Sequence, residues 1–162
     1  MKAQLSLEFY ASIVIFILFA TYVFFQLLGI EPQFMSSLNN ERLKSEAYQV
    51  SEMLVNSPGN PADWPGKSVT SIGLSSNLND SNLLSVQKIS AFNSLCGSSY
   101  DNMRSIIDTE YQFSVTLTNI SGGSSTLINC NSTTPMKTIR ASVTRIVALD
   151  SGDVGELKVE MW

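Results

Sequence analysis

The sequence lacks histidine altogether, and it has only two cysteines among 162 residues. Histidine is the most frequent general base near neutral pH and the most frequent metal ligand in proteins. Its absence excludes serine or cysteine nucleophiles that are activated by histidine. No glycine-rich phosphate-binding loop follows a candidate strand. We therefore expect a protein that is not an enzyme and that needs neither a cofactor nor a metal ion.

Basic residues are also scarce, because 10 Lys and Arg stand against 14 Asp and Glu, for a net charge of −4. Binding to nucleic acid depends on clustered positive charge that neutralises phosphates. No nucleic-acid partner is therefore expected.

Two acidic groups remain as candidates for chemistry. The first would bind calcium, but it misses the calcium-loop spacing, and solvated turn residues are the favoured interpretation. The second would serve acid–base catalysis only in a cleft, and the sequence does not indicate one. The groups are Asp150, Asp153 and Glu156, and Asp101, Asp108 and Glu110.

What the sequence does contain is an apolar run from Phe9 to Leu28, 20 residues without a charge, a proline or a glycine. As a helix that rises about 1.5 Å per residue, it is about 30 Å long, the thickness of a bilayer's hydrocarbon core. Ser12, Thr21 and Gln26 do not fall on one stripe, so the polar face of a soluble helix is missing. A removable secretory signal has a shorter apolar stretch and an Ala-x-Ala-like exit. The run therefore predicts a retained membrane-spanning helix.

The charges around the run predict its orientation. Lys2 and the amino terminus precede it, whereas Glu31 follows it and the next basic residue is Arg42. Basic residues favour the cytoplasmic side. We expect a single-pass membrane protein with a cytoplasmic N-terminus and an extracellular head.

The residues before the apolar run form a motif. The stretch KAQLSLE, residues 2–8, resembles the class III signal of archaeal type IV pilin-like proteins, whose pattern is Q-x-S-x-E-x-x-x-L. Gln4, Ser6 and Glu8 match this pattern, and Ser12 stands at its final leucine position. The stretch LVNSPGNPADW, residues 54–64, is also similar to the heads of this class.

The resemblance implies that a membrane-embedded prepilin peptidase cuts between Ala3 and Gln4 and leaves the helix on the mature chain. Lys2, Ala3 and Gln4 would form the processing site, and Ser6 and Glu8 would serve assembly. The partners would be other pilin subunits, in a homopolymer or a mixed filament at the cell surface, with the membrane as the host before assembly.

Glu8 has a physical role that does not depend on the family. A carboxylate at the bilayer centre costs about 2.5–3.5 kcal/mol on insertion scales, and less near the interface. Cleavage would create a positive amine on Gln4, and in an assembly that amine would pair with the Glu8 of a neighbouring copy. The alternative is that Glu8 only marks the N-terminus of a helix, where the helix dipole tolerates an anion.

The expected fold is α+β and type IV pilin-like, with a long N-terminal helix packed on an antiparallel sheet. Glu31-Pro32 is expected to interrupt the helix where the bilayer ends. Beyond it, Leu43, Ala47, Val50 and Leu54 form an amphipathic stripe. The expected divisions are a leader at 1–3, a membrane and assembly helix at 4–30, an amphipathic helix at 31–56 and an extracellular head at 57–162.

Within the head, alternating and helical patterns predict the elements. Trp64 lies in a loop rich in proline and glycine, where it either stacks on a ligand or closes one end of the core, the interpretation that we favour. Strands joined by short turns predict antiparallel pairing. We expect helices over 82–95 and 99–108, and strands over 69–74, 111–118, 126–130, 138–149 and 154–162.

Two kinds of covalent modification are possible in such a head. Cys96 and Cys130 are an even pair in an extracytoplasmic domain, which is most simply one disulfide. Asn79, Asn119 and Asn131 begin N-x-S/T sequons and are possible N-glycosylation sites, although this composition supplies about two or three sequons by chance.

The expected function is that of a structural subunit of an archaeal type IV pilus-like filament. Two alternatives remain open. One is a minor pilin or pseudopilin of a secretion or adhesion machine, and the other is a signal-anchored extracellular binding protein that does not polymerise.

Overall fold

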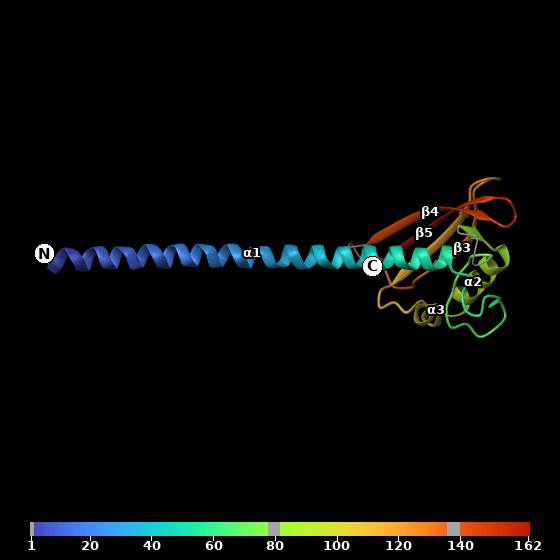
Figure 1. Ribbon diagram of the computed structural model, residues 1–162, viewed down its shortest axis with the longest axis horizontal. Coiled ribbons are helices and arrows are strands. Elements are labelled where there is room, and N and C mark those ends of the chain that lie inside the picture. The colour runs from blue at the N-terminus through green and yellow to red at the C-terminus, as the bar shows by residue number, and fades with distance from the viewer. Residues whose placement is uncertain (1, 78–81, 136–139) are drawn as a thin grey trace. The chain divides into compact units, whose positions relative to one another are not determined.

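The computed structural model describes the backbone of residues 2–77, 82–135 and 140–162, and their side chains outside 2–6 and 29–36. Its units are Met1–Asn39 and Asn40–Trp162, and the second contains every element after α1. In chain order (Figure 1) the elements are α1 Lys2–Asn56, β1 Leu83–Leu84, α2 Val86–Ser98, α3 Tyr100–Ile107, β2 Phe113–Asn119, β3 Ser125–Asn131, β4 Ala141–Leu149 and β5 Val154–Met161.

The first unit is helical and contains the apolar segment. Residues Leu7–Leu28 have a mean hydropathy of 2.3, and none of their side chains is buried in the chain. The segment is long and apolar enough to cross a membrane, as the sequence predicts. The expected interruption at Glu31-Pro32 is wrong, because the backbone of α1 is helical at both residues. Long helical stretches on either side offset the cost of the proline, about 3 kcal/mol.

The second unit is built on a five-stranded sheet of order β1-β4-β5-β2-β3. The pairs β4–β5, β5–β2 and β2–β3 are antiparallel, whereas β1 pairs with β4 in parallel. The sheet is therefore mixed, and the prediction of a wholly antiparallel sheet is wrong at β1. The exception has a physical basis, because a short hairpin enforces antiparallel pairing and β1 is linked to the sheet by α2 and α3 instead.

Most of the predicted head elements are present. The helix expected over 82–95 begins later, at Val86, because Leu83 and Leu84 pair with β4 and the Asp150 carboxylate accepts a hydrogen bond from the Val86 N–H at 3.0 Å. The strand expected over 69–74 is wrong, since this segment has only one isolated bridge, between Ser71 and Asn60. The start of the strand expected over 138–149 lies outside the described residues, and β4 begins at Ala141.

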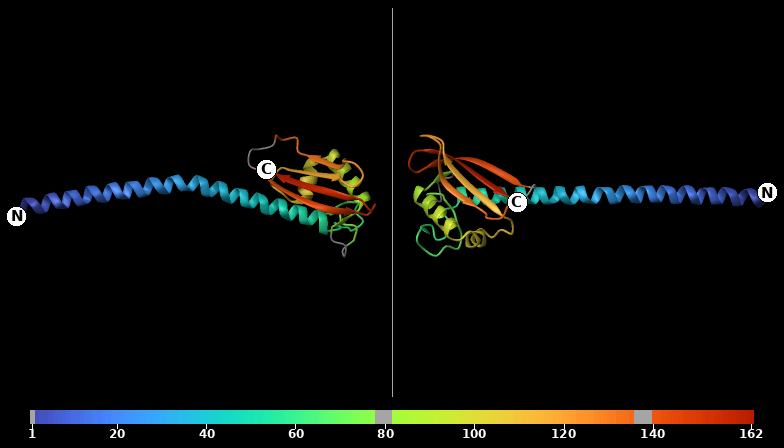
Figure 2. Two further views of the ribbon diagram at one scale, coloured as in Figure 1. Left: turned by 90° about the horizontal axis from the view of Figure 1, so that it is seen from above. Right: turned by 180° about the vertical axis from the view of Figure 1, so that it is seen from behind.

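The helices of the second unit and one face of the sheet enclose a single core (Figure 2). The predicted stripe of α1 is confirmed, because its four members are buried: Leu43, Ala47, Val50 and Leu54. Trp64 is fully buried in the same core, and its indole N–H donates to the Gly73 carbonyl at 2.9 Å. Trp64 therefore closes the core, as favoured from the sequence.

Arg145 of β4 fastens the sheet to the end of α1. Its guanidinium donates to the Glu52 carboxylate at 2.5 Å and to the Ser51 hydroxyl at 2.9 Å, and it lies 4.9 Å from the centre of the Tyr48 ring. Only 19% of the Arg145 side chain is exposed. Partial burial and a fixed fork geometry make such a pair stronger than a surface ion pair.

We predict that Arg145→Met lowers the free energy of unfolding by about 1–2 kcal/mol, because Glu52 and Ser51 lose their bonds to the guanidinium and keep only those to Asn56 and Tyr48. Urea unfolding of the full chain in detergent micelles, followed by tryptophan fluorescence, measures the change. Lys158→Met is the matched control, since its ammonium is more exposed than the Arg145 guanidinium and its partner Glu160 keeps an ion pair with Arg140, so the change should cost less than about 0.5 kcal/mol. Equal losses in both variants would contradict the assigned role of Arg145.

Candidate functional site

The predicted processing residues lie at the start of α1. The backbone of Lys2, Ala3, Gln4 and Ser6 is helical, and their side chains lie outside the described part of the chain. Their roles in cleavage and assembly therefore stay predictions.

Glu8 begins a polar line along the apolar segment. Its side chain is exposed, and its main-chain carbonyl accepts a hydrogen bond from the Ser12 hydroxyl at 2.9 Å. Near the other end of the segment, the Gln26 amide donates to the Tyr22 hydroxyl at 3.1 Å. Both bonds connect residues four apart, which are neighbours on one helix face.

These four residues share one side of the helix. Ser12, Tyr22 and Gln26 follow Glu8 by four, fourteen and eighteen residues, close to one, four and five turns at about 3.6 residues per turn. We call Glu8, Ser12, Tyr22 and Gln26 the polar stripe. The spacing of Ser12, Thr21 and Gln26 did not reveal the polar stripe, because Thr21 lies on the opposite face, whereas Glu8 and Tyr22 belong with Ser12 and Gln26.

The polar stripe has a clear preference for its surroundings. In hydrocarbon, polar side chains on a helix are most favourable where they contact polar groups of another helix. The rest of the segment offers large exposed apolar side chains, such as Phe16 and Leu18 at 70% and 65% exposure. The segment therefore combines a lipid-compatible surface with one side that is suited to helix–helix contact.

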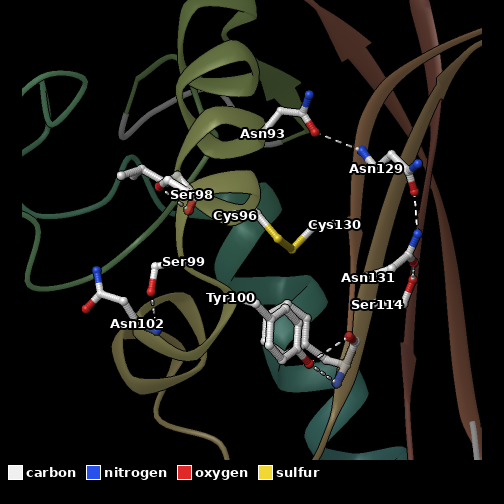
Figure 3. Close-up of a disulfide and its surroundings, with 12 residues drawn as sticks. Asn93, Cys96, Ser98, Ser99, Tyr100, Asn102, Ser114, Asn129, Cys130 and Asn131 are labelled. Atoms are coloured by element: carbon white, nitrogen blue, oxygen red, sulfur yellow. Dashed lines mark hydrogen bonds between the residues drawn. A yellow bond between two sulfur atoms is a disulfide. The ribbon is translucent and has the colours of Figure 1, made fainter. Parts of the chain in front are cut away.

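In the head, Cys96 of α2 and Cys130 of β3 form a disulfide (Figure 3), in agreement with the prediction. Their Cα atoms are 5.7 Å apart, and 34 residues separate them in sequence. A crosslink over such a loop stabilises the fold by about 3.5–4 kcal/mol in the chain-entropy model. The bond fixes α2 against the sheet strand that forms one edge.

Tyr100 supports the same region from α3. Its hydroxyl donates to the Phe113 carbonyl at 2.9 Å and accepts from the Phe113 N–H at 2.8 Å (Figure 3). Its ring stacks on that of Phe113, with 4.9 Å between the ring centres. Burial raises the pKa of the Tyr100 hydroxyl above its ordinary value of 10.0, and the bond to Phe113 opposes this rise.

The three sequon asparagines differ in their placement. Asn79 lies outside the described residues. Asn119 is half-buried at the end of β2, where its side-chain oxygen accepts from the Ser121 N–H at 2.9 Å. Asn131 is exposed on the solvent face of β3 and is hydrogen-bonded to Ser114 and Asn129 (Figure 3). Glycosylation of all three stays a prediction.

Of the two acidic groups considered for chemistry, the group of Asp101, Asp108 and Glu110 borders two open grooves. Asp108 and Glu110 face Arg42 and Glu46 in a groove of about 680 Å³ between α1 and the α3–β2 connection. A second groove, of about 360 Å³, is lined by Asp101, Asp108 and Glu110. Within the described ranges, no cluster of three or more His, Cys, Asp or Glu side chains is arranged to hold a metal ion.

A buried lysine, which sequence analysis did not single out, joins two loops of the head. The Lys88 ammonium donates to the carbonyls of Pro58 and Ser75, each at 2.8 Å. Burial lowers the pKa of Lys88, and the nearby Asp63 carboxylate opposes this effect. The two carbonyl bonds give Lys88 a structural role at the end of the core near Trp64.

Comparisons with known proteins add no relative. No protein-family model, no curated protein and no solved structure matches the chain closely enough for a relationship to be inferred. The assignment of function therefore depends on the residues and the geometry described above.

We predict that Tyr100→Phe lowers the free energy of unfolding by about 1–3 kcal/mol near pH 8, because the buried Phe113 backbone groups lose their partner. The raised pKa means that, above pH 10.0, the folded wild-type chain binds more protons than the unfolded chain. Wild-type stability therefore falls as pH rises through this value, and its advantage over Tyr100→Phe should shrink. Urea titrations at about pH 8 and about pH 11 measure both effects.

Tyr111→Phe is the control, since the Tyr111 hydroxyl has no hydrogen bond to a described residue. It should change stability by less than about 0.5 kcal/mol. If the difference in unfolding free energy between wild type and Tyr100→Phe did not change with pH, that result would contradict a raised pKa for Tyr100.

Proposed function

We propose that the chain is a structural subunit of an archaeal type IV pilus-like surface filament, which assembles through its N-terminal apolar helix. A prepilin peptidase cuts after Ala3, the helix stays on the mature chain, and the head is displayed outside the cell. The observation that carries the proposal is the polar stripe, with Glu8 at its start, on an apolar segment none of whose side chains is buried in the chain.

The polar stripe supports assembly because a simple membrane anchor has no need for it. A carboxylate and an amide on one side of a spanning helix raise the cost of lipid contact on that side alone. Packing against the helices of other copies relieves this cost, and the opposite side, where Thr21 lies, carries no charged or amide side chain between Leu7 and Leu28. The stripe thus favours a bundle of helices over a single helix in lipid.

Glu8 also determines how adjacent helices are placed relative to one another in this packing. Cleavage after Ala3 places a positive amine on Gln4, about one turn before Glu8 along the helix. An amine and a carboxylate that leave water are stable only as a pair. Pairing between adjacent copies repeats along an assembly and generates an open, helical array, as head-to-tail contacts do.

The head has properties that suit a displayed domain. The solvent face of its sheet is polar, and the Cys96–Cys130 disulfide is of a kind that persists in oxidising surroundings outside the cytoplasm. The same features also fit the alternative of a signal-anchored binding protein that does not polymerise. The polar stripe and the processing motif distinguish the two, and both are open to direct test.

The first test is the mature N-terminus. Mass spectrometry of the protein from its native membranes should find a chain that begins at Gln4 and retains the Leu7–Leu28 segment. The physical reason is that assembly needs both the helix and the newly formed amine. An intact Met1, or a cut beyond Ile30, would contradict the proposal.

The second test is Glu8→Gln, which removes the charge while it keeps the size of the side chain. We predict that the yield of sheared surface filaments falls at least about tenfold, because an amine without its carboxylate destabilises each contact by more than about 1.4 kcal/mol. Immunoblots of the membrane fraction check that the amount of subunit is unchanged.

Glu31→Gln is the matched control, since it removes the same charge beyond the apolar segment and should leave filaments intact. Gln26→Leu and Thr21→Leu form a second pair, which changes the polar stripe and the opposite face respectively. Loss of filaments in Gln26→Leu alone supports the stripe. Unchanged filaments in both Glu8→Gln and Gln26→Leu would favour an anchored protein that does not polymerise.

A further inference from the structure

The two edges of the sheet differ in how far their outward backbone groups are covered. An edge strand presents unpaired backbone N–H and C=O groups, and proteins normally protect such an edge. The sheet order places β3 at one edge, and β4 at the other wherever β1 does not cover it. Among the described residues, α2 contacts the first of these edges, and β1 covers only Ala148 and Leu149 of the second.

The β3 edge is covered by α2. The outward N–H of Asn129 donates to the Asn93 side chain of α2 at 3.0 Å, and the Cys96–Cys130 disulfide holds the helix in place (Figure 3). The register between β2 and β3 also shifts after Leu117, which disturbs the regular strand geometry. These features oppose the pairing of another strand at Asn129 and at the register shift.

The β4 edge is open over most of its length. Hydrogen-bonded pairs with β5 fall on the odd residues, because the Leu149 N–H bonds the Asp153 carbonyl and this pairing repeats every second residue. The even residues therefore point their backbone groups away from β5. The Ala148 N–H, for example, donates to the Asn82 carbonyl at 2.8 Å. β1 pairs only with Ala148 and Leu149, so it leaves the earlier even residues of β4 uncovered.

Three even residues remain, Ser142, Thr144 and Ile146, and we call their outward backbone the open edge. Across the described ranges of the chain, no backbone or side-chain group bonds their outward N–H or C=O groups. Their side chains are exposed on the solvent face, with Ile146 at 58% exposure. The open edge is thus accessible to another strand.

The usual protective devices are missing from the open edge. Between Ala141 and Leu149 there is no proline, and the pairing with β5 contains no bulge. The one charged side chain, Arg145, turns to the other face of the sheet, where Glu52 and Ser51 bind it. The open edge is therefore uncharged, regular and unguarded, which are the features that favour strand addition.

We propose that the open edge of β4 pairs with the open edge of a second copy of this chain, antiparallel and centred on Thr144. The two sheets then become one continuous sheet across a twofold axis. This inference does not depend on the proposed function, because it uses only the second unit of the chain.

A second copy fits because the open edge is self-complementary. When Thr144 lies opposite Thr144 of the second copy, each Ser142 lies opposite the Ile146 of the other copy. In each of these three facing pairs, the N–H and C=O groups of both residues point toward each other, which allows about six hydrogen bonds in total. Threonine pairs are favourable cross-strand neighbours, and no like charges face each other along the edge. A twofold contact of this kind is the commonest way for identical chains to associate.

The geometry also determines which copies can meet. A twofold axis normal to the sheet reverses the direction of the 40–56 stretch of α1 in the second copy. The contact therefore joins copies of opposite orientation and is distinct from packing within one polar assembly.

Cysteine crosslinking of the full chain in detergent micelles tests the pairing. Both native cysteines are already in a disulfide, so Thr144→Cys supplies the single free thiol. Its Cα would lie about 5.5 Å from the same atom of the second copy, within the range of a disulfide. Mild oxidation should give a covalent dimer on a non-reducing gel, at least about fivefold more than Thr116→Cys on the interior strand β2.

The register gives a second, sharper comparison. Ser142→Cys alone should crosslink poorly, because its two copies would be about 13 Å apart along the strands. A mixture of Ser142→Cys and Ile146→Cys chains should crosslink strongly. Adding Thr144→Lys to both chains of the mixture should abolish the product, since two like charges would face each other at the axis.

Three results would overturn the inference. One is crosslinking of Thr144→Cys no greater than that of Thr116→Cys. Another is equal crosslinking of Ser142→Cys alone and of the mixture of Ser142→Cys and Ile146→Cys chains, which would mean that the chains collide at random without a fixed register. A third is capture of a different protein by Thr144→Cys in native membranes in place of a second copy. Folding of each variant is checked by the intact Cys96–Cys130 disulfide.

Discussion

The molecule depends on one constraint, the exposure of an apolar helical segment, Leu7–Leu28. None of the side chains of Leu7–Leu28 is buried. Burying a large apolar side chain is worth about 1.5–3 kcal/mol, so the whole segment represents a free energy on the order of tens of kcal/mol. Folded domains have a net stability of only about 5–15 kcal/mol. The surroundings of the helix therefore decide where the protein resides more strongly than any feature of the head does.

The head meets a different requirement, because it must hold a helix end against a sheet in water. The stripe of α1 supplies the apolar contact, and Arg145 adds a directional one through Glu52, Ser51 and Tyr48. Lys88 binds the loop carbonyls that follow α1. These polar contacts lie at the margins of the core, where partial exposure lowers the cost of removing a charge from water. Apolar packing thus stabilises the head, and the charged contacts fix how its parts are arranged.

The sequence predicts the parts of the fold that depend on neighbours along the chain. The amphipathic stripe, α3 and the hairpin of β4 and β5 follow from periodicity and turn residues, and the structure contains them. It predicts poorly where a distant partner decides the outcome. Leu83 and Leu84 form a strand because β4 lies beside them, and α2 begins at Val86 where Asp150 accepts its first N–H.

The candidate site shows the same division. Glu8 and the processing motif are visible in the sequence because they are local. The polar stripe was also within reach, since it needs only helical spacing, but it required Glu8 and Tyr22 to be considered together with Ser12 and Gln26. The open edge of β4 was out of reach, because it depends on the strand order and on which backbone groups β1 leaves unpaired. Strand order is a long-range property, and no periodicity records it.

The polar stripe and the open edge are contacts of different strength, and each has consequences for the other. A strand pair with about six backbone hydrogen bonds gains about 3–9 kcal/mol, since each bond contributes about 0.5–1.5 kcal/mol net. Association costs two free molecules about 4–15 kcal/mol in lost motion. A single edge pair is therefore weak. If the apolar helices hold many copies in each of two assemblies of opposite orientation, the loss of motion is met once for the two assemblies, and edge pairs formed side by side between them reinforce one another. A free pair of chains joined through β4 is thus weak and short-lived, although oxidation of the Thr144→Cys variant can still trap it, and lasting pairs are expected between two assemblies of opposite orientation.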